Sequence, residues 1–329
     1  SIGRERKVKM LSNFIFSLNV SLPLFILMIL GYFLRKKDVV NESFLSCANT
    51  VIFQVALPAK LFLDTAQTDF TQSFEPMFLL LAVGGAIFFF ILFWLIGAVI
   101  IKEPRKVGAF VHGAVRGNYV YIGFPLIQNI LGTTALPAEA MLASAFVLPL
   151  YNILAVIVLT VTNHPGKKIR FGEVLKQIIT NPMIVGILAG LPFSFLSTYT
   201  GFALPFAVEK SLSYLGSLAT PLALLVIGAN TKVTAIASNM KAVLMACCFR
   251  LILQPLIIVP LALLARLSSN AVLVLFVLFG VPSAANVYIV TKKMGGDADL
   301  ASGIIVVSVI MSLFTLTTGI FLLRSIGVI

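Results

Sequence analysis

The chain has 329 residues, of which 59% are hydrophobic and only 11% are charged. Soluble globular domains carry about 25% charged residues, so this composition excludes a soluble protein and indicates a membrane protein with many spans. The formal net charge of +12 would suggest nucleic acid as the partner of a soluble protein. Here the basic residues cluster in short loops between apolar segments, as membrane topology requires. We therefore expect a lipid bilayer as partner and no nucleic acid.

Ten apolar segments follow a basic N-terminal tail, and each is close to the ~20 residues that a helix needs to cross a bilayer. Proline is expected to bend the second segment near Pro58 and the seventh near Pro221. The eighth segment carries Pro255 and Pro260. The predicted spans are 17–34, 44–63, 76–101, 107–131, 138–161, 181–195, 212–229, 242–264, 271–294 and 300–323.

The two halves of the chain resemble each other. Leu142–Val147 in the fifth span resembles Leu300–Ile305 in the tenth, and Gly123–Pro125 in the fourth matches Gly280–Pro282 in the ninth. Because each half holds an odd number of spans, the second half must enter the membrane in the opposite direction. We predict an all-α polytopic fold of ten transmembrane helices, built as two inverted five-helix repeats with crossed broken helices 4 and 9. The predicted units are an N-terminal tail (1–16), the first repeat (17–161), a cytoplasmic connector (162–180) and the second repeat (181–329).

The loop charges predict the orientation in the membrane. One set of loops is rich in Lys and Arg, for example Arg35–Lys37 after the first span and Lys102–Lys106 after the third. The opposite loops and the C-terminus hold Lys210, Arg266 and Arg324. The basic residues of the N-terminal tail argue against this assignment, but they are fewer than those of the basic loops. Because basic loops stay in the cytoplasm, we predict a multi-pass protein of the cytoplasmic membrane with both termini outside.

The connector between the repeats has two interpretations. Its apolar residues recur at helical spacing among basic ones, which favours a short helix lying in the lipid interface. A solvated loop that runs into the sixth span is the alternative. The residues that give the spacing are Phe171, Val174, Leu175, Ile178 and Ile179.

The fourth span contains residues that are costly in hydrocarbon unless they face protein or water. Arg116 brings a charge, and Gly117 and Gly123 loosen the helix. Pro125 lacks an N–H and clashes with the turn before it. We predict that the helix stops near Gly123 and restarts at Pro125, because proline suits the first position of a helix. Transporters build substrate sites from such broken helices.

Pro282 predicts a corresponding break in the ninth span. In an inverted repeat, both restarted half-helices direct their positive N-terminal ends at the membrane centre, which favours an anion. Arg116 would add a permanent charge whose fork suits a carboxylate. Nearby amides, hydroxyls and tyrosines would add hydrogen bonds or an aromatic wall. The predicted substrate-binding residues are Arg116, Asn118, Tyr119, Tyr121, Gly123, Pro125, Pro282, Ser283, Asn286 and Tyr288.

Each of these residues also has a structural interpretation. Prolines in membrane helices often only kink them. Arg116 could snorkel to the interface or pair with an acid, and Asn118 could cap the first half-helix. Arg250 in the eighth span and Lys60 in the second are the other cations that we expect to be buried. We interpret both as structural or as facing a cavity.

The sequence lacks the residues that several classes of function need. A cation/proton antiporter normally carries mid-membrane carboxylates, and the spans near the predicted crossing have none. Cys47, Cys247 and Cys248 show no metal-ligand spacing, and His112 and His164 have no nucleophile beside them in the sequence. We predict no enzyme activity, no metal and no cofactor. A membrane receptor or channel would leave two matched breaks unexplained.

Two stretches of the sequence resemble a known family. Arg116–Asn118 together with Gly123–Leu126 resembles the first broken-helix motif of the auxin efflux carrier family, which includes bacterial malonate and malate permeases and the plant PIN carriers. Pro282–Asn286 followed by Lys292–Asp297 is similar to the second motif. The resemblance covers nearly all of residues 10–329.

That resemblance implies an NhaA-like or bile-acid-transporter-like fold. It implies a scaffold domain of helices 1, 2, 6 and 7, a transport domain of helices 3–5 and 8–10, and an elevator-like movement between them. It also places Asn118 at the substrate site and suggests a homodimer.

We therefore predict a secondary active transporter for a small organic anion of the carboxylate class, bound between Pro125 and Pro282. The coupling ion stays open between a proton and sodium. The nearest alternative is a sodium-coupled organic-anion carrier of the bile-acid-transporter-like fold. Its sodium site would need a cluster of oxygen ligands that the sequence does not reveal.

Overall fold

The computed structural model describes residues 2–67, 75–163, 172, 176, 179–230 and 239–329. Helices form all the regular secondary structure of these residues, apart from one isolated antiparallel bridge between Gly117 and Ser283. Eight helical stretches there are long and apolar enough to cross a membrane. Two shorter apolar stretches, Tyr119–Leu131 and Ser269–Gly280, fall in the fourth and ninth predicted spans. The prediction of an all-helical membrane protein with many spans is confirmed.

Several predicted spans consist of helical pieces joined end to end, some of them π-helical turns (η). The first half contains α1 (Ile2–Lys36), α2 (Glu42–Val51), η1 (Ile52–Ala56), α3 (Leu57–Ala66), α4 (Pro76–Leu79), η2 (Leu80–Gly84), α5 (Gly85–Ile100), α6 (Pro104–Val115), η3 (Tyr119–Gly123), α7 (Phe124–Leu131) and α8 (Ala138–Asn163). The second half contains α10 (Pro182–Thr200), α11 (Phe206–Ser217), α12 (Ala219–Ala229), α13 (Met240–Cys248), η6 (Phe249–Leu253), α14 (Gln254–Leu264), α15 (Ser269–Gly280), α16 (Asn286–Lys293) and α17 (Ala298–Ser325).

Both ends of the first repeat extend beyond the predicted spans. α1 begins at Ile2, so the stretch predicted as an N-terminal tail is helical. α8 continues to Asn163. The apolar spacing that suggested an interfacial helix in the connector, Phe171 to Ile179, falls almost entirely outside the described residues.

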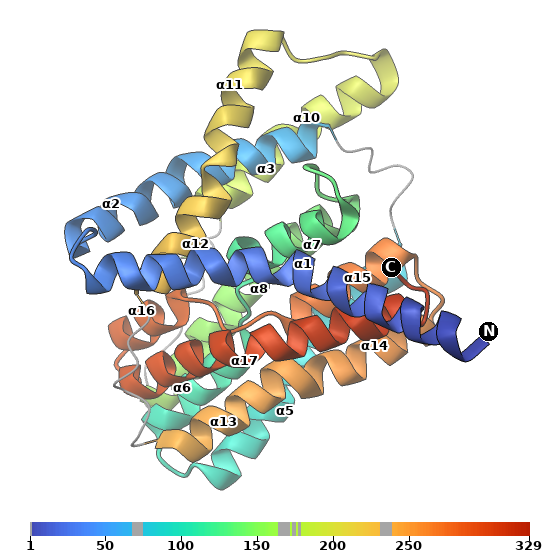
Figure 1. The fold of residues 1–329 in the computed structure, drawn as a ribbon. Helices are drawn as coiled ribbons and strands as arrows, with labels where there is room; N and C mark the ends of the chain where they lie inside the picture. Colours follow the sequence, from blue (N-terminus) through green and yellow to red (C-terminus); the bar gives the residue numbers. More distant parts are fainter. Residues whose placement is uncertain (1, 68–74, 164–171, 173–175, 177–178, 231–238) are drawn as a thin grey trace.

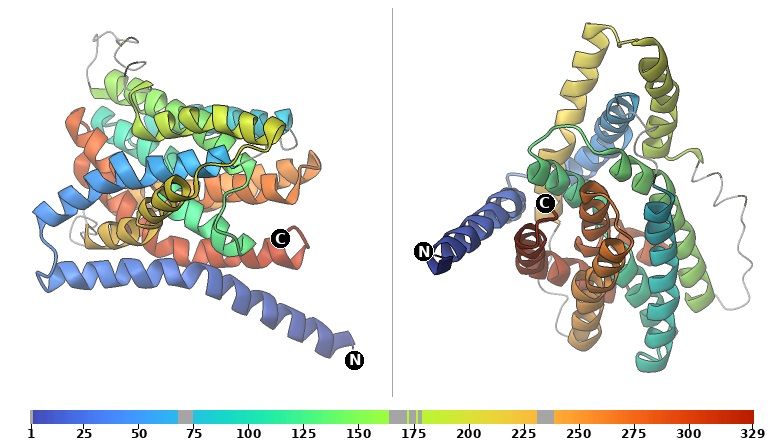
Figure 2. Two further views of the ribbon diagram at one scale, coloured as in Figure 1. Left: turned by 90° about the horizontal axis from the view of Figure 1, so that it is seen from above. Right: turned by 90° about the vertical axis from the view of Figure 1, so that its right-hand side faces the viewer.

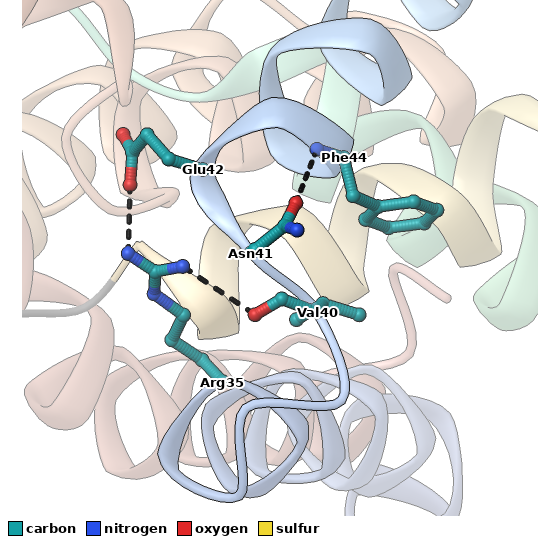
Figure 3. Close-up of polar contacts among 5 residues, drawn as sticks. All are labelled: Arg35, Val40, Asn41, Glu42 and Phe44. Atoms are coloured by element: carbon teal, nitrogen blue, oxygen red, sulfur yellow. Dashed lines mark hydrogen bonds and ion pairs between the residues drawn. The ribbon is translucent and has the colours of Figure 1, made fainter.

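The turn from α1 to α2 shows how polar side chains set the helix ends (Figure 3). The side chain of Asn41 accepts a hydrogen bond from the backbone N–H of Phe44 at 2.9 Å, which caps the first turn of α2. Arg35, in the last turn of α1, forms a 2.8 Å ion pair with Glu42 and donates to the carbonyl of Val40. These contacts join the end of one helix to the start of the next.

Prolines inside spans are accommodated by π-helical turns. Of the four such turns in the described part of the chain, η1 ends two residues before Pro58, η3 two before Pro125 and η6 two before Pro255. A π-turn closes its hydrogen bonds over five residues rather than four. It therefore gives room to the proline ring and to the carbonyl that loses its donor. The helix continues through each of these prolines.

Two groups of helices lie side by side (Figures 1 and 2). In the first helix group, which comprises α1–α3 and α10–α12, α3 packs against α10 and α11, and α1 packs against α12. In the second helix group, which comprises α4–α8 and α13–α17, α6 packs against α5, α8 and α17, and α14 packs against α15. Contacts of α1 with α17 and of α3 with α8 join the groups. The two termini lie at the same end of the bundle (Figure 1).

The most enclosed helices are α6 and α15. Every residue of α15 from Ala271 to Gly280 is buried, and so is every residue of α6 from Val107 to Val115. A helix that is apolar on all sides and buried on all sides belongs to the interior of a large protein. These two helices precede the predicted breaks, so the breaks are held inside protein rather than exposed to lipid.

α1 and α12 approach so closely that their backbones touch at two glycines. A Cβ at Gly31 would overlap the backbone carbonyl of Leu225, and a Cβ at Gly228 would overlap that of Met28. Small residues allow membrane helices to pack at this distance.

Gly228→Ala is expected to lower the apparent melting temperature of the purified protein. The carbonyl of Met28 belongs to a helix backbone and cannot turn aside as a flexible side chain would, and overpacking of this kind costs about 1–3 kcal/mol. Thermal unfolding in detergent measures the shift. Gly84→Ala is the control, because the only atom near a Cβ there is a Leu80 side-chain carbon at 3.9 Å. Equal shifts would show that the α1–α12 contact tolerates a methyl group.

Candidate functional site

Two helices are interrupted by short irregular segments in the interior of the protein. The first break, residues 116–118, lies between α6 and η3, and the second break, residues 281–285, lies between α15 and α16. Arg116 and Val281, which begin the two breaks, have extended backbones with ψ of 106° and 153°. Broken backbone at this depth requires hydrogen-bond partners from the protein or from a water-filled cavity.

The two breaks supply backbone partners to each other. Beside the Gly117–Ser283 bridge, the N–H of Asn118 donates to the carbonyl of Pro282 at 2.7 Å. In return, the N–H of Ala284 donates to the carbonyl of Arg116 at 3.0 Å. Without the other break, the backbone N–H and carbonyl groups of either break would lack these hydrogen-bond partners. The two breaks therefore form one structural unit.

The predicted position of the first break is wrong. Gly123–Pro125 resembles Gly280–Pro282 in sequence, but the structure opposes Gly117 to Ser283. Pro125 lies in the first turn of α7, which continues directly from η3. The helix therefore restarts at Tyr119 rather than at Pro125. The π-turn accommodates the proline, whereas pairing with the second break stabilises the extended backbone.

Arg250 organises both breaks from η6. Its side chain is fully buried. Its Nε donates to the carbonyl of Val281 at 2.8 Å, its Nη1 donates to the carbonyl of Val115 at 2.8 Å, and its Nη2 donates to the carbonyl of Leu278. These carbonyls lie at or just beyond the C-terminal ends of α6 and α15, where the helix dipole places partial negative charge. One guanidinium thus caps two helix ends.

Gln254 and Gly117 complete this arrangement. Gln254, one helical turn after Arg250, accepts from the guanidinium at 3.0 Å and donates to the carbonyl of Ala114 at 2.7 Å. A Cβ at Gly117 would overlap the guanidinium, so glycine is required for the close approach of the first break to Arg250. The sequence indicates that Arg250 is structural or faces a cavity, but it does not associate Arg250 with the breaks. An arginine and a glutamine four residues apart in an apolar span were the available signal.

Three polar side-chain atoms next to the bridge are buried without a hydrogen-bond partner. They are Nδ2 of Asn118, Oγ of Ser283 and Oδ1 of Asn286. Leaving such an atom unpaired costs about 1–3 kcal/mol, and buried polar atoms in native proteins usually have partners. All three belong to residues that the sequence predicted for a binding site, and the first two belong to adjacent backbone positions across the paired breaks.

The predicted aromatic residues have structural contacts. The hydroxyl of Tyr119 donates to the carbonyl of Ala140 at 3.4 Å, and its ring packs edge-on against Phe124. Tyr121 is partly buried. The hydroxyl of Tyr288 accepts a hydrogen bond from Lys292 at 3.4 Å. None of these contacts links an aromatic ring to the three unpartnered atoms.

Gly123 and Pro125 are both buried on the restarted half of the first broken helix. A Cβ at Gly123 would lie 3.0 Å from a side-chain carbon of Val277, so this glycine lets η3 pack closely on α15. These two residues shape the packing around the breaks rather than forming part of the backbone pairing.

Arg116 directs its guanidinium toward α8. Its Nη1 donates to Oδ1 of Asn152 at 2.6 Å, and it lines a small cavity together with His112 and Tyr151. Asn152 is therefore a residue of the site, although it is not among the predicted substrate-binding residues. Arg116 remains a permanent positive charge immediately beside the first break.

The buried acids of the described residues lie away from the two breaks. Asp64 in α3 forms a 3.1 Å ion pair with Lys60, one turn earlier on the same helix. Glu139, at the start of α8, accepts a hydrogen bond from Ser268 at 3.3 Å. The charged side chains described at the breaks themselves, Arg116 and Arg250, are both positive. The structure therefore places Lys60 in an ion pair rather than at the candidate site.

The sequence is similar to known transporters over nearly its whole length. A family model described as "Membrane transport protein" matches residues 16–320. An uncharacterized transporter of Methanocaldococcus jannaschii is 27% identical over 312 residues, covering 91% of this chain and 96% of that protein. A Rhizobium meliloti protein named "Putative malonate transporter" is 26% identical over 311 residues, covering 92% and 95%. An uncharacterized transporter of Methanothermobacter thermautotrophicus is 22% identical over 305 residues, covering 92% and 97%.

The fold and the site define a multi-pass membrane protein whose interior contains two paired, broken helices with unsatisfied polar groups. The chain belongs to the membrane transport protein family, which is the auxin efflux carrier family that the two sequence motifs indicated.

Proposed function

We propose that this protein is a secondary active transporter that binds a small carboxylate at the paired breaks. The observation that carries the proposal is the set of unpartnered atoms of Asn118, Ser283 and Asn286 beside the Gly117–Ser283 bridge. An amide nitrogen and a serine hydroxyl can donate to carboxylate oxygens, and the amide oxygen of Asn286 can accept from a hydroxyl or a water. A polar ligand would satisfy atoms that the protein leaves unpaired.

The electrostatics around the breaks support an anionic ligand. The C-terminal ends of α6 and α15 lie at the breaks and are partially negative, and the Arg250 guanidinium donates hydrogen bonds at both. The restarted pieces η3 and α16 present their partially positive N-terminal ends at the same breaks. Arg116 adds a full positive charge. The balance of charge at the breaks is therefore positive, which favours an anion.

The relatives support the same class of substrate. A relative that spans 92% of this chain is named for malonate, a small dicarboxylate. Malonate is therefore the probe that we would use first, without assuming that it is the physiological substrate.

The architecture that we propose has ten spans in two inverted repeats. The spans broken at residues 116–118 and 281–285 count as one each, which adds them to the eight long helical stretches. The first helix group corresponds to a scaffold domain and the second to a transport domain, and the way the helices pack within each group supports this division. We propose that the second helix group moves against the first in an elevator-like manner, and that a homodimer forms through the first.

Asn118→Ala is expected to weaken malonate binding without unfolding the protein. A hydrogen bond to a charged group contributes about 1.5–3 kcal/mol, so affinity should fall roughly ten- to hundred-fold. A thermal-shift titration measures this, because a ligand of the folded state raises its apparent stability. Asn129→Ala, which removes an exposed amide from α7, is the matched control. Unchanged binding in Asn118→Ala would remove this residue from the site.

The proposed orientation can be tested with single cysteines. In a chain whose Cys47, Cys247 and Cys248 are replaced by serine, a membrane-impermeant maleimide added outside intact cells should label Thr133→Cys. It should leave Asp38→Cys unlabelled until the cells are opened, because the basic loops stay in the cytoplasm. The reverse pattern would invert the topology.

A further inference from the structure

A small cavity lies beside the first break, on the side of α8. Its polar lining consists of His112, Arg116 and Tyr151, and the rest of the wall is apolar. Its volume is about 10 Å³, close to the space that one water molecule needs. A carboxylate does not fit there, whereas a water or a proton carried by an imidazole does.

His112 contributes an imidazole with one fixed and one free nitrogen. The residue is buried in α6, and its Nδ1 lies 3.2 Å from Oγ1 of Thr291 in α16. Its Nε2 is buried without a hydrogen-bond partner. The ring therefore connects the two broken helices through one nitrogen and leaves the other available. A neutral imidazole has one accepting nitrogen, and a protonated one donates from both.

Arg116 is the charge that acts on His112. His112 and Arg116 line the same cavity. Desolvation and the like charge of the guanidinium both oppose a second positive charge there. One buried carboxylate of the described residues lies on an element packed against α6. It is Glu139 in α8, which accepts a hydrogen bond from Ser268 and lies 12 residues, or about 18 Å of helix, before Tyr151. α5 has no titratable side chain, and Lys292, Lys293 and Asp299 are exposed. The other buried titratable groups of the described residues on these elements are Tyr151 in α8, Cys247 in α13 and Arg250 in η6.

We propose that His112 is a proton-binding site and that the transporter carries its anion together with a proton. This inference rests on the proposed function. In the tautomer whose Nδ1–H donates to Thr291, Nε2 is the accepting nitrogen. An anion at the paired breaks would offset the charge of Arg116, so Nε2 could then take a proton from solvent through the water in the cavity. By reciprocity, protonation of His112 would strengthen anion binding by the same factor. After the elevator-like movement of the second helix group, release of the anion would return the proton to water on the other side of the membrane.

The test is the pH dependence of malonate binding to purified protein between about pH 7 and about pH 8.5, above the range in which a free carboxylate titrates. Uptake of one proton per anion makes the Kd rise by up to about tenfold per pH unit. We expect this slope in the wild type and in His164→Gln, which alters the only other histidine. We expect a flat profile in His112→Gln. A full slope in His112→Gln, or a flat profile in the wild type, would overturn the proposal.

A second measurement needs no variant of His112. Calorimetric titration of the wild type with malonate in buffers of different protonation enthalpy gives the number of protons taken up on binding. A value near one supports the site, and a value of zero overturns it even if His112→Gln does not fold.

The two proposals can fail separately. Malonate binding with no proton uptake would leave the carboxylate site intact and remove the proton site. Without malonate binding, the proposed function fails for this dicarboxylate. The imidazole signal of His112 in a protein carrying both Arg116→Gln and His164→Gln, followed by nuclear magnetic resonance, then judges the proton site alone, because this protein lacks the charge that opposes protonation. Titration within the range in which the protein stays folded supports the site, and an unchanging signal overturns it.

Discussion

Arg250→Met is expected to abolish transport and to lower the apparent melting temperature by roughly 5–10 °C. Methionine keeps much of the volume but donates no hydrogen bond, so the carbonyls of Val115, Leu278 and Val281 lose their partner. Each buried unpaired carbonyl costs about 1–3 kcal/mol. The partial negative charges at the ends of α6 and α15 would also lie uncompensated at the breaks.

Thermal unfolding in detergent and uptake of labelled malonate into proteoliposomes measure the two effects. Arg324→Met is the control, because Arg324, in the last turn of α17, is partly exposed and its guanidinium lies over the ring of Phe16 and donates to Oδ1 of Asn13 rather than to backbone carbonyls of the breaks. Arg250→Lys should fall between wild type and Arg250→Met, since lysine keeps the charge but cannot contact three carbonyls with a planar fork. If Arg250→Met unfolds at the wild-type temperature, water rather than Arg250 satisfies the carbonyls at the breaks.

The spans could be predicted from the sequence because they depend on a local property. Runs of about 20 apolar residues between basic loops can form only helices across a bilayer, and the helical stretches follow these runs. The break at residues 116–118 could not be located in the same way. Pro125 is the stronger local signal, but the energetic effect of a proline depends on whether a π-turn precedes it. The extended backbone at Gly117 is stabilised by a segment more than 160 residues later in the chain.

The sequence singles out polar residues that lie beside the breaks, although it does not locate the backbone that carries them. Asn118, Ser283 and Asn286 are polar residues in apolar spans, and such residues are placed there for a reason that the sequence reveals. The partners of Arg116 and Arg250 were not predictable. Asn152, which binds Arg116, and Gln254, which binds Arg250, become recognisable only when α8 and η6 are packed against the breaks. Side-chain pairing across the fold is a tertiary property that residue type alone does not specify.

Gly117→Ala is expected to disrupt the paired breaks through Arg250. The added Cβ would overlap the guanidinium, which cannot move aside without giving up its hydrogen bonds to the carbonyls of Val115 and Val281. We expect uptake of malonate to fall to background and the melting temperature to fall by several degrees, by roughly half the effect of Arg250→Met. Gly84→Ala is again the control, because the only atom near a Cβ there is the Leu80 side-chain carbon at 3.9 Å.

A double-mutant cycle separates this mechanism from a general intolerance of alanine at Gly117. In the Arg250→Met background, the guanidinium is absent and the flexible methionine side chain can yield to the new methyl group. The stability cost of Gly117→Ala should then be smaller than in the wild type, by an interaction energy of about 0.5–3 kcal/mol. Additive costs would mean that Gly117 is needed for the backbone of the first break itself. A smaller cost in the Arg250→Met background would assign the role of Gly117 to the approach of Arg250, and would make the guanidinium the group around which both broken helices are built.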